Sequence, residues 1–175
     1  HWTLVNDNRF LAITGGCMAD FTREEVLDIA KKLTGANLVG IDLSDTNLIG
    51  ANLMGTNLSE VNLRNANLTG ANLDGAMLIV SNLREANLLV ANLIEANLEG
   101  ASLVGANLSG IDLSDANMIR TNLTNAEMTG ASLMGTNFAH ANLEGVTLTG
   151  ACYNSDTKWP EGFNPVEAGA METEA

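Results

Sequence analysis

The stretch from Ala36 to Leu58 reads ANLVGIDLSDTNLIGANLMGTNL, and a five-residue unit repeats through it without interruption. From residue 36 to residue 150 the chain holds 23 consecutive units in one frame. The third slot is Leu in 20 of the 23 units, and the exceptions are Met118, Met128 and Phe138. The first slot is small or β-branched, the second slot is Asn in 16 units, and Gly is the commonest fifth residue. The repeat is therefore the feature that organises this chain.

A five-residue period fits neither a regular α-helix nor a straight β-strand. On a helix, five residues turn the chain by about 500°, so successive leucines would spread around the whole cylinder. On a straight strand, an odd spacing would send alternate leucines to opposite faces. A short extended segment with a bend in every unit removes both problems, because the first and third slots then point inward together. Gly in the fifth slot suits such a bend. We expect four units to close one coil, which gives six coils at residues 36–55, 56–75, 76–95, 96–115, 116–135 and 136–155.

These units resemble the pentapeptide-repeat family, whose pattern is A-(D/N)-L-x-x. The resemblance implies an all-β solenoid, in the form of a right-handed quadrilateral β-helix of about six coils. The ending YNSDTKWPEGFNP also resembles the tail of cyanobacterial members. That likeness implies a cyanobacterium-like source, with the cytoplasm and the thylakoid lumen as candidate compartments.

Caps are predicted at both ends of the solenoid, because bare coil edges would aggregate. The sequence divides into an N-terminal cap at 1–35, the β-helix at 36–155, and a C-terminal cap with an acidic tail at 156–175. In the C-terminal cap, Trp159 and Phe163 predict a hook over the last coil. The acidic end beyond Val166 has a composition typical of disorder.

The N-terminal cap carries the signals of one short helix. Thr22 and Glu25 form a capping box, and Phe21 and Val26 are spaced as a hydrophobic staple. These signals predict a capping α-helix over about residues 23–33. Before it, the runs TLV and RFLAI favour a small β-hairpin.

Composition excludes several classes of function. A net charge of −13 argues against direct nucleic-acid binding and against anionic membranes, since phosphate contact needs clustered Lys and Arg. No apolar run approaches the roughly 18 residues that a membrane span requires. Cys17 and Cys152 lie near opposite ends of the chain, so we expect free thiols rather than a disulfide framework.

The sequence offers little for catalysis. It contains no HExxH, CxxC, Walker loop, GxGxxG or nucleophile elbow. Its histidines are His1 and His140, and no carboxylate shares the column of His140 nearby. Asp42 and Asp45 span one corner with no third metal ligand evident. We therefore expect no enzymatic activity, no cofactor and no metal.

Binding is the remaining interpretation, and the outward slots indicate where it would occur. Between residues 76 and 94 the fourth and fifth slots hold the apolar residues Ile79, Val80, Leu89, Val90 and Ile94, and a contiguous exposed apolar patch usually marks an interaction site. Sequence drift is the competing explanation, because isolated exposed apolar residues are common. The predicted partner-binding residues are Ile49, Met54, Ile79, Val80, Leu89, Val90, Ile94 and Met134.

Two functions agree with this pattern. The first is a non-catalytic scaffold that binds a protein partner, or its own copy as a homo-oligomer, through the apolar flank. The second is an acidic DNA mimic that inhibits or protects a DNA-binding enzyme such as a topoisomerase, as the resemblance to gyrase-protecting family members implies. Mimicry requires carboxylates in rows, whereas the 11 acids and 3 basic residues of the repeat region are spread over its faces. The sequence favours the scaffold and does not identify its partner.

Overall fold

The N-terminal part of the chain forms a small antiparallel sheet. The computed structural model describes residues 2–6, 9–14, 17–22 and 34–174. The sheet has the order β1-β2-β3 and consists of β1 (Trp2–Asn6), β2 (Arg9–Thr14) and β3 (Cys17–Thr22). The antiparallel pairing of β1 with β2 confirms the predicted hairpin, and β3 adds a strand that was not predicted. The predicted helix at 23–33 lies outside the described residues.

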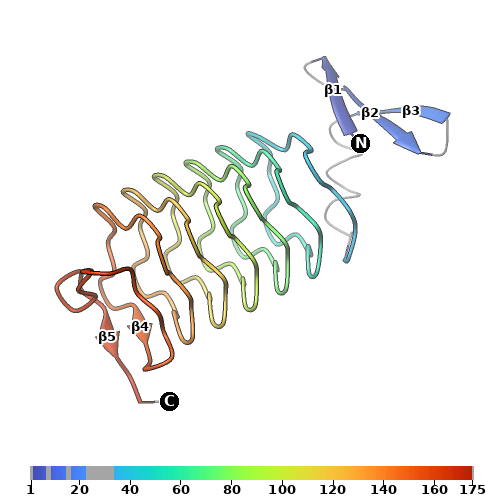
Figure 1. Ribbon diagram of the computed structural model, residues 1–175. Coiled ribbons are helices and arrows are strands. Elements are labelled where there is room, and N and C mark those ends of the chain that lie inside the picture. The colour runs from blue at the N-terminus through green and yellow to red at the C-terminus, as the bar shows by residue number, and fades with distance from the viewer. Residues whose placement is uncertain (1, 7–8, 15–16, 23–33, 175) are drawn as a thin grey trace.

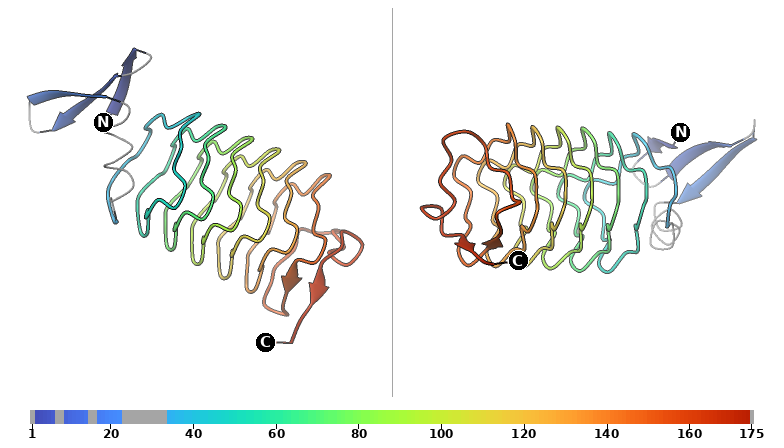
Figure 2. Two further views of the ribbon diagram at one scale, coloured as in Figure 1. Left: turned by 180° about the vertical axis from the view of Figure 1, so that it is seen from behind. Right: turned by 60° about the horizontal axis from the view of Figure 1, so that its bottom comes forward.

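The repeat region forms a rod of stacked coils (Figure 1). From Asn37 to Ser132, each second-slot residue makes a parallel bridge with the residue 20 positions later, as Asn37 does with Asn57. The Leu38 N–H donates to the Asn57 carbonyl at 2.8 Å, and the Asn57 N–H donates to the Ala36 carbonyl at 2.8 Å. The same pattern recurs along the rod, and the views in Figure 2 show the coils in register. The predicted coil of four units is therefore confirmed.

A tight turn at the end of every unit produces the corners of the coil. In one example the Ala51 N–H donates to the Leu48 carbonyl at 3.0 Å, and Gly50, the third residue of the turn, has a φ of 62°. A positive φ at this position is the requirement of a type II turn. Eleven described non-glycine residues also have positive φ, and all of them occupy the fifth slot.

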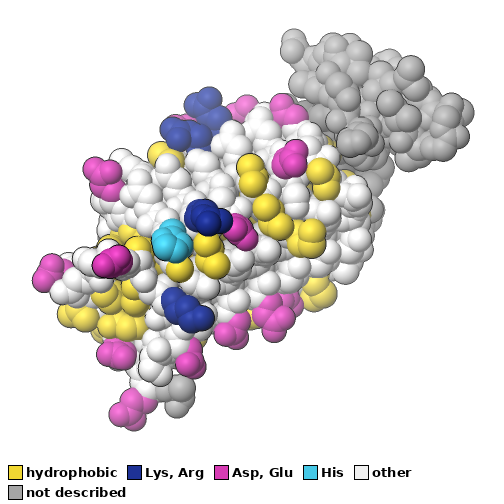
Figure 3. Space-filling model, in the orientation of Figure 1, with side chains coloured by type: hydrophobic (Ala, Val, Ile, Leu, Met, Phe, Trp, Pro, Cys, Tyr) yellow, Lys and Arg dark blue, Asp and Glu magenta, His cyan; other side chains and the backbone are white. Residues whose placement is uncertain are grey.

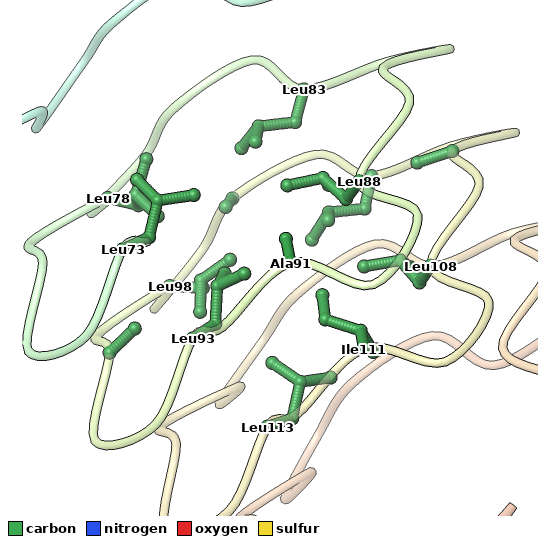
Figure 4. Close-up of a cluster of buried hydrophobic side chains, with 14 of the residues drawn as sticks. Leu73, Leu78, Leu83, Leu88, Ala91, Leu93, Leu98, Leu108, Ile111 and Leu113 are labelled. Carbon is green, nitrogen blue, oxygen red and sulfur yellow. The ribbon is translucent and has the colours of Figure 1, made fainter. Parts of the chain in front are cut away.

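The first and third slots fill the interior of the rod. Leu78, Leu88 and Leu93 are fully buried, and Figure 4 shows leucines from different sides of the coils pointing into the shared core. Burying a Leu side chain contributes about 1.5–3 kcal/mol, so this ladder is the main driving force for folding. Thr in the first slot donates its hydroxyl to a backbone carbonyl, within the turn at Thr46 and Thr121 and to Leu113, 23 residues earlier, at Thr136. The Thr46 hydroxyl, for example, donates to the Leu43 carbonyl at 2.6 Å.

The second-slot asparagines have two structural roles. Side-chain amides bond between coils, as where Asn82 Nδ2 donates to Asn62 Oδ1 at 3.0 Å, and this confirms the ladder that the repeat predicts. The side-chain oxygen also caps the turn within its own unit. Asn47 Oδ1 accepts the Ile49 N–H at 3.2 Å in this way. The frequency of Asn in this slot therefore has a structural cause.

The C-terminal segment closes the far end of the rod. Strand β4 (Cys152–Tyr153) pairs in parallel with β5 (Met171–Glu172), which lies beyond Val166. The prediction that the chain is disordered beyond Val166 is therefore wrong. Met171 and Thr173 donate their N–H groups to carbonyls of the last coil at 2.8 Å. The unpaired edge of that coil orders the segment despite its acidic composition.

An aromatic cluster packs against the last coil and confirms the predicted hook. The Trp159 ring stacks on Phe138 with centroids 5.0 Å apart and an interplanar angle of 9°. Tyr153 meets the indole edge-on at 5.4 Å, and Phe163 lies at 5.4 Å on a tilted ring plane. Asp156 is an extra residue in the repeat, so Lys158 bridges to a residue 21 positions earlier, Asn137. This insertion brings Trp159 over the Phe138 ring.

Candidate partner-binding surface

The corners of the rod present the side chains that point away from the core. We number the four sides of a coil as faces one to four in chain order, so that face one begins at Ala36 and face three begins at Thr46. Each face ends in a corner formed by the fourth and fifth slots of its units. Because the bridges join residues 20 apart, each slot forms a column along the rod.

The eight predicted partner-binding residues lie at three of these four corners. None of them belongs to the buried core, and Val80, Val90 and Ile49 are the most exposed, at 63%, 58% and 51%. The face-one corner carries Ile79 and Val80, the face-three corner carries Ile49, Leu89 and Val90, and the face-four corner carries Met54, Ile94 and Met134.

The coil geometry brings only some of these residues together. Leu89 and Val90 precede face four of the third coil, and Ile94 ends that face, so these three residues border one side of the rod. Ile79 and Val80 lie half a coil away from Leu89 and Val90, at the opposite corner. The five predicted residues of the third coil therefore lie on two surfaces rather than in one continuous patch, and Ile49, Met54 and Met134 belong to the first and fifth coils.

Met77 is an exposed apolar residue that the prediction omits. It occupies a second slot on face one and is 40% exposed. Its backbone makes the usual bridges to Asn57 and Asn97, so only the side chain departs from the asparagine column. The sequence signal that could have identified Met77 is a methionine in a slot where Asn is usual, because a methionine side chain makes no amide hydrogen bonds to the neighbouring coils.

Val80 and Val90 adopt a backbone conformation that is energetically unfavourable for valine. Their φ angles are 56° and 49°, in the left-handed region. A β-branched residue is a genuine outlier there, and the left-handed conformation costs an L-residue roughly 1–2 kcal/mol. The contrast is strongest at the face-three corner, where Val90 is the one non-glycine in the fifth-slot column. The other members of that column are Gly50, Gly70, Gly110, Gly130 and Gly150.

The distribution of charge also distinguishes face three. The six units of face three contain one ionisable residue, Glu127, and they span 46–50, 66–70, 86–90, 106–110, 126–130 and 146–150. Within residues 34–174, the ion pairs lie on faces two and one. They join Arg64 to Glu85 at 3.6 Å and Arg120 to Glu99 at 3.3 Å. Figure 3 shows one side of the rod, on which hydrophobic side chains lie in small groups among charged ones.

The described part of the chain contains neither a candidate metal-binding cluster nor a helix suited to spanning a membrane. Residues 2–6, 9–14, 17–22 and 34–174 contain no group of three or more His, Cys, Asp or Glu side chains that could hold a metal ion. Over the same residues, no helix has the length and apolar character needed to cross a bilayer. The thiol of Cys152 is free and lies 3.8 Å from the Ala131 carbonyl oxygen.

Comparison with solved structures finds other pentapeptide repeat proteins. Rfr23 from the cyanobacterium Cyanothece 51142 is 30% identical, over 72% of this chain and 89% of that chain, with a TM-score of 0.44. A pentapeptide repeat protein from Nostoc PCC 7120 is 36% identical, over 64% of this chain and 84% of that one, with a TM-score of 0.30. QnrB1, a plasmid-mediated fluoroquinolone resistance protein, is 14% identical over 82% of this chain and 87% of that one, with a TM-score of 0.48.

The sequence comparisons give one family assignment. A search of curated proteins finds no match. The family model for pentapeptide repeats matches in 8 copies, over residues 32–65, 56–88, 71–110, 91–130 and 111–150. These matches cover most of the chain and coincide with the bridged coils. The protein belongs to the pentapeptide-repeat family.

Proposed function

We propose that this protein is a non-catalytic interaction scaffold that binds a protein partner through outward apolar side chains of its third coil. The observation that carries the proposal is the combination of exposure and strain at Val80 and Val90. Both valines occupy a slot where Gly is commonest, and both leave more than half of the residue in water. Exposed apolar side chains and left-handed valines each work against stability and solubility, so a contact role is a reason to keep them.

A fifth-slot side chain lies beside the fifth slot of the next coil, and for Val80 and Val90 that position is a glycine. A Cβ atom on Gly110 would lie 3.1 Å from Val90 Cγ1, and a Cβ atom on Gly100 would lie 3.6 Å from Val80 Cγ2. Each valine therefore leans over a glycine of the next coil. The absence of a side chain at that glycine leaves room for the valine.

The family supports the same class of function. Pentapeptide repeat proteins are generally structural or interaction proteins. The fold suits that role, because regular coils form a rigid wall on which outward side chains have fixed spacing. The DNA-mimic alternative requires rows of carboxylates along the rod, whereas the 11 acids of the repeat region are spread over its faces.

Affinity capture with matched variants tests the proposal. We expect the tagged protein to recover a specific partner from an extract of its source cells. The double change Leu89→Glu and Ile94→Glu should abolish that recovery, because it places two charges in the contact. The control is Val104→Glu with Ala139→Glu. Both control residues are outward, apolar, fourth-slot positions outside the predicted set, and the change in net charge is the same.

The comparison between the two double variants decides the outcome. Recovery by the control together with loss in the Leu89/Ile94 variant supports the proposal. Equal recovery by both variants contradicts it, and so does equal loss with both proteins folded by circular dichroism. In either case the function would lie elsewhere on the rod.

A further inference from the structure

We infer that the partner of the face-three corner is a second copy of this chain, packed face three against face three around Val90. The inference rests on the proposed function and identifies the partner. It is argued from the charge-poor character of face three, the position of Val90 in the glycine column, and the net charge of the molecule.

Charge restricts which partner face three can accept. Each copy carries a net charge of −13, so two copies repel one another over most approaches. Face three, with Glu127 as its one ionisable residue, is the side on which that repulsion is weakest. A basic partner would instead gain most on the other faces, where Asp42, Asp74 and Asp112 lie. Face three, whose one ionisable residue is Glu127, therefore fits a partner that is itself acidic and also presents a charge-poor face, and a second copy meets both conditions.

The shape of the corner suits pairing with itself. Val90 projects from the glycine column, and a Cβ atom added to Gly70 or Gly130 would meet nothing within 4 Å. These glycines carry no side chain and face open space, so Val90 provides the one side chain of this fifth-slot column. In an antiparallel pairing centred on the fourth coil, the third coil of one copy lies against the fifth coil of the other. Val90 of each copy then faces Gly130 of the other, which gives the self-complementary contact that a two-fold dimer requires.

The polar residues of the corner are compatible with such a contact. The fourth-slot column holds Leu89 beside Thr69, Ser109 and Thr129, which are short uncharged side chains. The Thr69 hydroxyl is already bonded to Asn67 Oδ1 at 2.6 Å, so covering it leaves that donor satisfied. Because the wall is narrow, we expect a weak and reversible dimer rather than an obligate one.

Sedimentation equilibrium of the full chain tests this inference, with Val90→Glu and Val80→Glu as matched variants. Both changes replace an exposed left-handed valine of the third coil, at opposite corners of the rod. Glutamate is compatible with the fold at this slot, since Glu60, Glu85 and Glu95 have φ angles of 59°, 59° and 55°. We expect Val90→Glu to weaken dimerisation at least about tenfold, because a two-fold axis brings in two charges. Val80→Glu should leave dimerisation within about twofold of the parent chain.

Salt dependence provides the second readout. Self-association of a molecule with net charge −13 should strengthen as salt rises from about 0.05 M to about 0.5 M, because screening shortens the range of the repulsion. A chain that stays monomeric throughout, or equal weakening by the two variants, overturns the inference. Association that weakens with salt also overturns it, since that result indicates attraction between opposite charges. If the chain is monomeric while the Leu89/Ile94 variant still loses a captured partner, the proposed function stands and only the identity of the partner is wrong.

Discussion

Replacing Leu93 by Ala should destabilise the protein by about 2–5 kcal/mol. Leu93 is fully buried, and the same column of the core contains Leu73 and Leu113, one coil before and one coil after it. The interlocked backbone ladder holds these neighbours in place. The Asn92 N–H, for example, donates to the Ala71 carbonyl at 2.9 Å. The coils therefore cannot collapse into the space that the missing side chain leaves, and a cavity remains.

Chemical denaturation of Leu93→Ala and Ile94→Ala measures this difference. Ile94 is the next residue in the chain, but it occupies an outward slot and should change the free energy of unfolding by only about 0.5 kcal/mol. Comparable losses in the two variants would show that the third slot is not the inward one, and the coil register would have to be revised.

Replacing Trp159 by Ala should cost about 3 kcal/mol and lead to aggregation. The indole stacks on Phe138 at 5.0 Å and contacts Tyr153 and Phe163 at 5.4 Å, so it holds the C-terminal segment against the last coil. Without it the edge of that coil would lose its cover. Thermal melting combined with light scattering measures both effects.

Trp159→Phe is the matched control for the aromatic cap. The indole N–H is buried without a hydrogen-bond partner among the described residues, so a phenyl ring removes an unsatisfied donor and keeps the stack. We expect Trp159→Phe to retain most of the stability. If it loses as much as Trp159→Ala, or if Trp159→Ala remains stable and monomeric, the cluster does not act as a cap.

The sequence predicts the interior of the rod well because one pattern determines it. Leucine fills the third slot in 20 of the 23 units, and a coil with one bend per unit is the arrangement that buries these leucines together. Leu78, Leu88 and Leu93 are buried as expected. The C-terminal segment shows where composition misleads. Its acidic residues favour disorder, yet the exposed backbone edge at Cys152 and Tyr153 pairs with β5. The composition of the segment itself therefore cannot predict that it pairs with a backbone edge formed by residues elsewhere in the chain.

The candidate surface was predictable only in part. The slot positions correctly place Leu89 and Ile79 outside the core. Both residues belong to the third coil, and the sequence alone therefore suggests that they form a single patch. Closure of four faces puts them at opposite corners instead. The strain at Val80 and Val90 follows from valine in a glycine slot, and the φ angles of 56° and 49° demonstrate it. Whether a partner covers these residues depends on a second molecule, which one chain does not specify.

The central claim is that the third coil keeps outward apolar residues for contact at the expense of stability, and Val90→Gly tests it most directly. Glycine removes the left-handed penalty of roughly 1–2 kcal/mol, and its greater freedom in the unfolded chain offsets about 0.5–1 kcal/mol of that gain. Denaturation and sedimentation of Val90→Gly and Val80→Gly should show both variants equally or more stable than the parent chain. Self-association should weaken in Val90→Gly alone. A Val90→Gly protein that is less stable, or that associates as strongly as the parent chain, would contradict the claim.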